Sequence, residues 1–257
     1  MFEIDLQGFV AIVVGGSRGI GGAITRELAG AGATVVFTHT GGVNTGQALS
    51  LEEKINAKGL NARGVAVDAT DAKATRKLVD SVVQSYGRVD GLVFNVGRNT
   101  PIDAVDLTED SWQRHMDLNL TSAFYAAKSV LPHMCHAEHG RIILIGSSAV
   151  YDGGGGALDY AAAKAGLDGM MAYLCRTYLR RGIVTNVIHP CVIETDLLKG
   201  RYSGPEQRKK LVDQIPVGRL GRPEDIAGLV VFLFSSWGEY ICGQKILADG
   251  GRTLYNK

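Results

Sequence analysis

Short, mostly apolar runs alternate along this chain with longer segments whose apolar residues recur at helical spacing. Runs of this kind, without a regular polar alternation, are typical of strands that are covered on both faces. They are Phe9–Val14, Thr34–Thr38, Gly64–Val67, Gly91–Phe94, Arg141–Ile145 and Ile183–Ile188. The pattern therefore predicts strands inside a sheet that has no solvated face.

The segments between and after these runs carry apolar residues every three to four positions, which predicts amphipathic helices. They are Ile20–Ala29, Gly46–Lys58, Ala72–Ser85, Asp110–Cys135, Tyr160–Arg180 and Pro223–Phe234. Strand–helix alternation predicts an α/β fold, in which a doubly wound parallel sheet carries helices on both sides. We find no internal repeat and no long linker, so residues 1–257 are predicted to form a single domain.

Composition supports a globular protein with a substantial core, because 46% of the residues are hydrophobic. The 27 basic and 26 acidic residues leave a net charge of +1, so neither nucleic acid nor an anionic membrane is an expected partner. The N-terminus lacks a signal-peptide pattern, and no apolar stretch approaches the roughly 20 residues that span a bilayer. We therefore expect a cytoplasmic protein with no membrane attachment.

The four cysteines form no C-x-x-C pair, which predicts a reducing compartment rather than a disulfide framework or a zinc site. Three histidines and a cysteine lie close together in sequence at His133, Cys135, His136 and His139. Pro132 before them and Gly140 after them indicate a helix end at the surface, so no metal site is predicted. His115 and His189 are interpreted as ordinary packed residues.

The first predicted strand runs directly into the glycine-rich turn Val14-Gly15-Gly16-Ser17-Arg18-Gly19-Ile20-Gly21, which opens a helix. Glycines let the backbone approach a pyrophosphate, and the helix N-terminus supplies amide donors and a positive dipole end. No G-K-[ST] follows, so the turn is not a P-loop. The turn predicts a dinucleotide site whose residues are Gly15, Ser17, Arg18, Gly19, Ile20 and Gly21.

The second strand ends in Phe37-Thr38-His39-Thr40, without the acid that usually bonds the ribose 2′-hydroxyl in NAD sites. Arg18, inside the glycine turn, could instead meet a 2′-phosphate, and His39 and Thr40 could add donors. We therefore predict NADP(H) rather than NAD(H). The alternative is that Arg18 is simply solvated.

Tyr160 and Lys164 lie four residues apart on one face of a predicted helix, and Ser147 stands thirteen residues before the tyrosine. An ammonium group near a phenol favours the phenolate. Two unit charges ~4 Å apart at an effective dielectric constant of ~20 interact by ~4 kcal/mol, which could lower the tyrosine pKa by about three at most. The pair therefore predicts proton transfer near neutral pH.

With these motifs in order, the chain resembles the short-chain dehydrogenase/reductase family from end to end. It is similar to the family's 3-oxoacyl-ACP reductases and to its sugar or polyol dehydrogenases. The resemblance implies a single Rossmann domain with a mostly parallel, seven-stranded sheet and helices on both faces.

Further motifs carry the same resemblance. Phe94-Asn95-Val96-Gly97 matches the family's Asn-Asn-Ala-Gly stretch, and Pro190-Cys191-Val192-Ile193-Glu194-Thr195 matches its Pro-Gly motif. The resemblance implies the catalytic residues Asn119, Ser147, Tyr160 and Lys164. It also implies further cofactor contacts at Asp68, Ala69, Asn95, Val96, Gly97, Tyr160, Lys164, Pro190, Ile193 and Thr195.

Three residues depart from the family pattern. Val14 replaces a threonine whose hydroxyl helps to fix the glycine turn, and Val96 is larger than the usual alanine near the adenosine. Cys191 replaces a glycine beside the nicotinamide and is either a tolerated small residue or an oxidisable thiol.

The activity implied by the resemblance is NADP(H)-dependent interconversion of a ketone and a secondary alcohol. Ser147 would donate a hydrogen bond to the carbonyl oxygen, and Tyr160 would act as general acid or base. Lys164 would shift the tyrosine pKa and bind the nicotinamide ribose, and Asn119 would hold a water molecule. The substrate is a small carbonyl or alcohol compound, with a 3-oxoacyl thioester and a sugar or polyol both open.

Two other functions remain possible on the same fold: a non-catalytic dinucleotide sensor or scaffold, and an epimerase or lyase. Family members commonly form tetramers, so a homotetramer is expected.

A substrate lid is predicted within residues 191–215, because Leu197–Gln214 is polar and interrupted by Gly200 and Pro205. Its basic side chains could attract an anionic substrate or could form a solvated helix face. The pocket walls are expected at Val150, Tyr151 and Gly153–Gly156.

Overall fold

The sheet is the frame of the molecule. In the computed structural model, which describes residues 4–195, 198, 200 and 204–254, seven parallel strands pair in the order β3-β2-β1-β4-β5-β6-β7. The strands are β1 (Val10–Val14), β2 (Thr34–His39), β3 (Ala62–Ala66), β4 (Gly91–Phe94), β5 (Gly140–Ile145), β6 (Ile183–Pro190) and β7 (Lys245–Ala248). This confirms the predicted doubly wound α/β fold.

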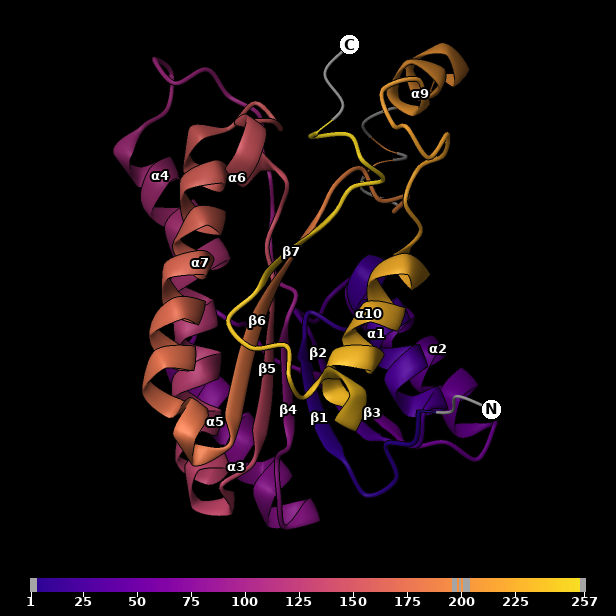
Figure 1. Ribbon diagram of the computed structural model, residues 1–257, viewed down its shortest axis with the longest axis vertical. Coiled ribbons are helices and arrows are strands. Elements are labelled where there is room, and N and C mark those ends of the chain that lie inside the picture. The colour runs from indigo at the N-terminus through magenta and orange to yellow at the C-terminus, as the bar shows by residue number, and fades with distance from the viewer. Residues whose placement is uncertain (1–3, 196–197, 199, 201–203, 255–257) are drawn as a thin grey trace.

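Helices cover both faces of the sheet (Figure 1). One layer contains α1 (Gly19–Gly30), α2 (Asn44–Asn56) and α10 (Pro223–Phe234). The other contains α3 (Ala72–Tyr86), α4 (Glu109–Met116), α5 (Ser122–Ala137), the short α6 (Ala149–Asp152) and α7 (Leu158–Tyr178). Each helix layer packs against one face of the sheet and forms a separate hydrophobic cluster with it. The central strands are uniformly buried because both of their faces are packed.

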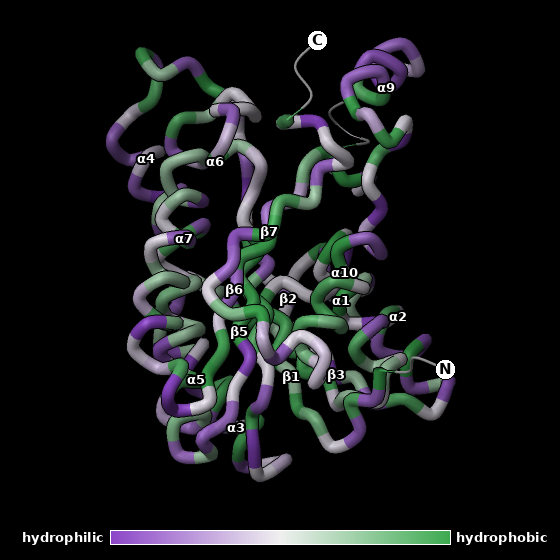
Figure 2. Tube along the Cα trace, in the orientation of Figure 1, coloured by the Kyte–Doolittle hydropathy of each residue, from purple (hydrophilic) through white to green (hydrophobic). Residues whose placement is uncertain are grey.

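Figure 2 shows where hydrophobic and hydrophilic residues lie along the chain, and the hydrophobic ones are concentrated in the central strands and in α10. The short helix α9 (Pro205–Val212) is hydrophilic and stands apart from the two main layers. Among the described residues, none of the helices has the length and hydropathy needed to cross a bilayer.

The predicted helix Asp110–Cys135 is interrupted. After α4 the chain makes one π-helical turn, η1 (Asp117–Thr121), before α5 begins at Ser122. A π turn inserts an extra residue into the helical register and is often found at functional sites. This turn places Asn119 in the buried interior.

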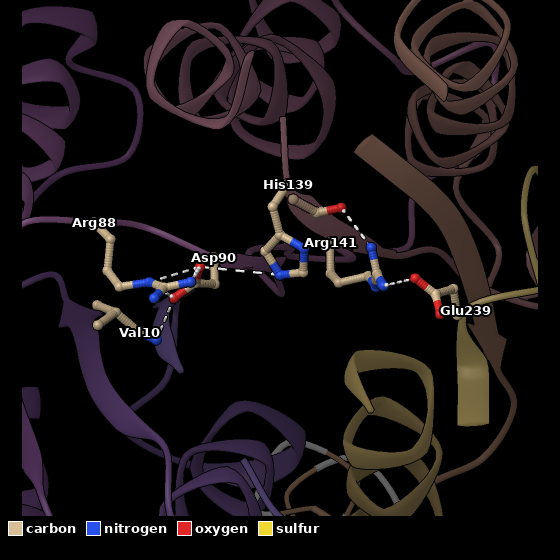
Figure 3. A network of polar contacts seen from close by, with 7 residues as sticks. Val10, Arg88, Asp90, His139, Arg141 and Glu239 are labelled. Atoms are coloured by element: carbon tan, nitrogen blue, oxygen red, sulfur yellow. Dashed lines mark hydrogen bonds and ion pairs between the residues drawn. The ribbon is translucent and has the colours of Figure 1, made fainter. Parts of the chain in front are cut away.

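A network of polar contacts holds the amino-terminal ends of the central strands (Figure 3). Asp90, which is 1% exposed, accepts a 2.8 Å hydrogen bond from the backbone N–H of Val10 at the start of β1. Its carboxylate also receives the Nε and Nη2 groups of Arg88 at 2.6–2.9 Å, and these hydrogen bonds raise the pKa of Arg88. The network is distant from the glycine turn, which follows the other end of β1.

The same network continues across β5. His139 Nε2 lies 4.0 Å from Asp90, and burial lowers the pKa of His139. Arg141, which is 5% exposed, donates through Nη2 to Glu239 at 3.2 Å. These contacts tie the starts of β1, β4 and β5 to the segment that precedes β7, and we interpret them as structural.

Candidate active site

A cleft of about 690 Å³ lies where the carboxyl ends of the strands meet. Ligands of doubly wound folds bind at this edge, where the strand order reverses between β1 and β4. The cleft is lined by all but two of the catalytic and cofactor-binding residues predicted from the sequence. Gly21 and Asn119 are the exceptions, and both lie buried behind the lining.

The glycine turn forms one end of the cleft. Gly15 has a φ of +78°, and its N–H donates to Thr38 Oγ1 at 2.9 Å. A Cβ on Gly21 would lie 2.0 Å from the carbonyl oxygen of Gly15, so only glycine lets the first turn of α1 pack against the loop. Asn95 closes the arrangement by donating from Nδ2 to the same oxygen at 2.9 Å.

The start of α1 fits an anionic group. Arg18 occupies the N-cap position without a side-chain capping hydrogen bond, and Ser17, Arg18 and Gly19 all line the cleft. Uncapped amides at a helix N-terminus are donors suited to phosphate oxygens. The residues present therefore fit a dinucleotide pyrophosphate.

The adenosine end of the cleft has the composition expected from the sequence. Arg18, His39 and Thr40 line it, together with Asn44, whose amide donates to Thr40 Oγ1 at 2.8 Å. No carboxylate of β2 faces this part of the cleft. Asp68 and Ala69 lie after β3 and also line the cleft.

The four candidate catalytic residues converge at the other end. Ser147 follows β5, and its hydroxyl is hydrogen-bonded to Tyr160 in the first turn of α7. Lys164, one turn further along α7, places Nζ 5.9 Å from the centroid of the Tyr160 ring. A Cβ on Gly97 would lie 3.0 Å from both Lys164 Nζ and Asn119 Oδ1, so this glycine leaves room for both side chains.

The electrostatics of the pair differ from the sequence expectation. Burial raises the pKa of Tyr160, and the hydrogen bond to Ser147 opposes this only in part. Burial also lowers the pKa of Lys164 from 10.5 to about 7. The amine donates to the backbone oxygens of Val96 at 3.1 Å and Ile145 at 2.9 Å rather than to the tyrosine hydroxyl. The expected lowering of the tyrosine pKa by Lys164 is therefore wrong for this structure, because burial raises this pKa and only the hydrogen bond to Ser147 acts against it.

The side-chain amide of Asn119 is hydrogen-bonded to backbone groups. Nδ2 donates to the carbonyl oxygens of His115 at 3.0 Å and Arg98 at 3.2 Å, and Oδ1 accepts from the Arg98 N–H at 3.1 Å. The side chain thus holds the loop after β4 against the π turn. Its predicted role in binding a water molecule stays a prediction.

Known proteins of one family resemble this chain over almost its whole length. The family described as enoyl-(acyl carrier protein) reductase matches residues 14–253. The 3-oxoacyl-[acyl-carrier-protein] reductase FabG of Escherichia coli is 38% identical over 251 residues, which is 98% of this chain and all of the relative. A solved short-chain dehydrogenase/reductase from Serratia marcescens is 34% identical with a TM-score of 0.89, over 96% of this chain and 99% of its own.

The chain belongs to the short-chain dehydrogenase/reductase family. It is an oxidoreductase that acts on CH–OH or ketone groups, as the resemblance predicted. A further structure, of a protein from Agrobacterium tumefaciens proposed to be a gluconate dehydrogenase, is 30% identical with a TM-score of 0.93 over the full length of both chains.

The site of this short-chain dehydrogenase/reductase also contains residues that the sequence did not reveal. Arg252 lines the cleft, donates to Gln214 Oε1 at 2.9 Å and lies 3.8 Å from the Asp152 carboxylate. Its Nη1 is 3.3 Å from Cys191 Sγ, and Cys191 is buried. No spacing connects Arg252 with residues so distant in sequence, so only the fold could reveal this contact.

One departure from the family pattern is compensated. Val14 has no hydroxyl for the glycine turn, but Thr38 on the neighbouring strand supplies one to the Gly15 amide.

The expected pocket walls are confirmed only in part. Gly154 and Gly155 line the cleft, whereas Val150, Gly153 and Gly156 do not. Tyr151 does not line it either, and its ring packs edge-on against His189 at 5.3 Å.

The histidines near the end of α5 face separate carboxylates. His133 lies 3.8 Å from Asp80, and His139 lies 4.0 Å from Asp90. In the part of the chain that the structure describes, no group of three or more metal-ligating side chains is assembled.

The predicted lid is described only in part. Leu198 and Leu211, one on each side of Pro205, line the cleft, and Arg208 in α9 pairs with Glu194. The segment's residues 196–197, 199 and 201–203 lie outside the described residues, so its role as a lid stays a prediction.

Proposed function

We propose that this short-chain dehydrogenase/reductase uses NADP(H) to reduce the ketone of a 3-oxoacyl thioester to a secondary alcohol. The observation that carries the proposal is the convergence of Ser147, Tyr160 and Lys164 at one end of a cleft whose other end is the glycine turn. The full-length similarity to the 3-oxoacyl-[acyl-carrier-protein] reductase of E. coli supports the substrate class.

The residues that would hold the cofactor are those of the glycine turn, with Arg18 toward a 2′-phosphate and Asp68 toward the adenine. Ile193 and Thr195 also line the cleft and would contact the nicotinamide carboxamide. When bound, the reduced nicotinamide supplies the hydride.

The chain's own groups would then handle the oxygen of the substrate. Ser147 would donate a hydrogen bond that stabilises negative charge developing on the carbonyl oxygen. Tyr160 would deliver the proton, and its raised pKa keeps the phenol protonated for this task. Lys164, with a pKa of about 7, could return a proton to the tyrosine near neutral pH.

A cofactor-oxidation screen tests the proposal. Purified protein with NADPH is offered 3-oxoacyl thioesters, keto-sugars, sugar acids and cyclic ketones, and the loss of reduced-nicotinamide absorbance is followed. We expect the highest kcat/KM with a 3-oxoacyl thioester. Failure of every class, with NADPH still bound, would favour a sensor or scaffold instead.

A sugar or polyol dehydrogenase is the second candidate, because charged side chains of Asp152 and Arg252 line the cleft. These groups suit a polar substrate better than an acyl chain. The similarity to the Agrobacterium protein supports the same candidate. Higher kcat/KM with a sugar or sugar acid in the screen would favour it.

The cofactor preference can be tested separately. Arg18→Ala should lower kcat/KM for NADPH at least tenfold while changing that for NADH little, because a guanidinium–phosphate contact is charge-assisted. Arg26→Ala is the matched control, since Arg26 lies on the same helix and pairs with Glu224 at 2.8 Å. Equal losses with both cofactors would contradict the assignment.

We further propose a cytoplasmic homotetramer. Exposed aromatic residues on the outer surfaces of α5 and α7, at Phe124 and Tyr173, and near β7, at Trp237 and Tyr240, support association. Light scattering coupled to size-exclusion chromatography gives the mass, and a monomer at micromolar concentration would contradict the tetramer.

A further inference from the structure

The backbone amide of Ser147 has an unusual partner. On either side of it, the Gly146 and Ser148 amides donate to the β6 backbone at Ile188 O (2.7 Å) and Pro190 O (3.0 Å). The Ser147 amide instead donates to a side chain, Nδ1 of His189, at 3.1 Å, and the carbonyl oxygen of Ser147 lies 3.0 Å from the same nitrogen. The residue that presents its hydroxyl to the cleft is therefore anchored by an imidazole.

The imidazole is itself held in one orientation. His189 is 0% exposed, and its Nε2 lies 2.9 Å from Asp168 Oδ1, an atom of a side chain on α7. The ring of Tyr151 packs on it edge-on, at an angle of 81°. A Cβ at position 146 would lie 2.4 Å from Nδ1, so Gly146 is required for the ring to reach the serine.

The pairing with Asp168 favours one tautomer. A carboxylate only accepts hydrogen bonds, so a neutral ring places its proton on Nε2 and leaves Nδ1 as an acceptor for the Ser147 amide. A proton on Nδ1 would instead be donated to the Ser147 carbonyl oxygen, 3.0 Å away. Lys245 lies 3.2 Å from the other oxygen, Asp168 Oδ2, and an ammonium only donates. Both oxygens of Asp168 are thus engaged as acceptors.

The anchor reaches the reacting groups through Ser147. The serine Oγ accepts the Ala149 amide at 3.2 Å and is hydrogen-bonded to Tyr160. A rotation of the peptide before Ser147 would move this hydroxyl relative to the tyrosine. We propose that Asp168 and His189 form a positioning pair that sets the Ser147 hydroxyl for catalysis, an inference that rests on the proposed function for its kinetic consequence.

Two substitutions of His189, with side chains of similar size, distinguish a role in positioning Ser147 from a role in packing. His189→Leu fills the space without an acceptor, whereas His189→Asn carries an amide oxygen at the place of Nδ1. A misplacement of about 1 Å can cost about 10²-fold in rate. We expect kcat to fall 10- to 100-fold in His189→Leu, with the Kd for NADPH and the substrate KM within about threefold, and His189→Asn to recover most of the rate.

Asp168→Asn gives a sharper test. In this variant the Lys245 ammonium binds the oxygen of the new amide, so the amide NH₂ group faces Nε2 of His189. Nε2 then accepts a hydrogen bond from this NH₂ group, and the ring proton moves to Nδ1. The Ser147 amide then loses its acceptor. We expect kcat to fall, but by less than in His189→Leu, because the new Nδ1–H can still donate to the Ser147 carbonyl oxygen 3.0 Å away. His133→Asn is the matched control, because His133 faces Asp80 at 3.8 Å on a distant surface.

Nitrogen-15 NMR of imidazole-labelled protein reads the tautomer directly. The chain has six histidines, and the His189→Asn spectrum identifies the signals of His189 by their loss. We expect a protonated Nε2 and an unprotonated Nδ1 in the wild type, with the reverse in Asp168→Asn. Hydrogen exchange of the Ser147 amide should accelerate at least tenfold in both Asp168→Asn and His189→Leu.

The NMR and exchange measurements need no substrate, so they decide on the positioning pair even if every tested carbonyl compound fails. A protonated Nδ1 in the wild type, or unchanged exchange of the Ser147 amide in His189→Leu, would overturn the inference. So would equal losses of kcat in His189→Leu and His189→Asn. Inactivity of the wild type with the predicted tautomer and exchange would instead overturn the proposed function alone.

Discussion

Replacing Lys164 with methionine should change how the stability of this protein depends on pH. The lysine is 2% exposed, and burial lowers its pKa from 10.5 to about 7. In the unfolded chain the amine is solvated and keeps its proton until pH approaches 10.5. Between these two values the unfolded state binds more protons than the folded state, so the stability of the wild type rises with pH.

The magnitude follows from the two pKa values. Each pH unit within the window contributes about 1.36 kcal/mol, so the whole interval from about 7 to 10.5 corresponds to roughly 5 kcal/mol. Below about pH 7 the cost of burying the charge is present in full, and above 10.5 it is absent. Lys164→Met removes this pH-dependent contribution, although it also leaves the carbonyls of Val96 and Ile145 without their donor.

Urea unfolding followed by circular dichroism at several pH values, at one fixed protein concentration, measures the effect. The free energy of unfolding of the wild type, minus that of Lys164→Met, should rise by about 2–3 kcal/mol between pH 7 and pH 9. Lys128→Met, on the exposed surface of α5, controls for the loss of a lysine. Parallel stability curves for wild type and Lys164→Met would refute the reasoning, because the amine would then titrate alike in both states.

Two further substitutions test the cofactor turn and the polar network at the opposite edge of the sheet. Gly21→Ala should abolish NADPH binding in a fluorescence titration, because its Cβ would lie 2.0 Å from a backbone oxygen of the turn. Gly30→Ala, in open space on the same helix, should bind normally, and similar affinities of the two variants would argue against the glycine turn as the cofactor site. Asp90→Ala should lower the free energy of unfolding by about 3 kcal/mol in urea, since the buried Val10 amide loses a charged acceptor; a loss below about 1 kcal/mol would show that the network contributes little.

Much of the fold could be predicted from hydrophobic periodicity alone. The helix Pro223–Phe234 was bounded correctly, because proline at the first turn and an apolar face mark it clearly. The π turn at Asp117–Thr121 could not be found, since one inserted residue hardly alters a periodicity averaged over a long helix. The strand Lys245–Ala248 was not identified either, because it is short, lies at the sheet edge and begins with a lysine.

The candidate site, like the fold, could be predicted from the sequence only in part. Motif spacing located Ser147, Tyr160 and Lys164, because the residues of one helix turn and one strand end are near each other in sequence. It could not locate Asp168 and His189, which meet only where α7 packs beside β6. Burial likewise follows from the whole fold, and for this reason the direction of the tyrosine pKa could not be derived from a two-charge estimate.

The most direct test of the account is the rate of NADPH-dependent carbonyl reduction by Tyr160→Phe. If Tyr160 delivers the proton, kcat should fall by about 10²–10⁴-fold while the Kd for NADPH stays close to that of the wild type. A variant that reduces its substrate at a near-wild-type rate would contradict the central claim that this phenol is the general acid.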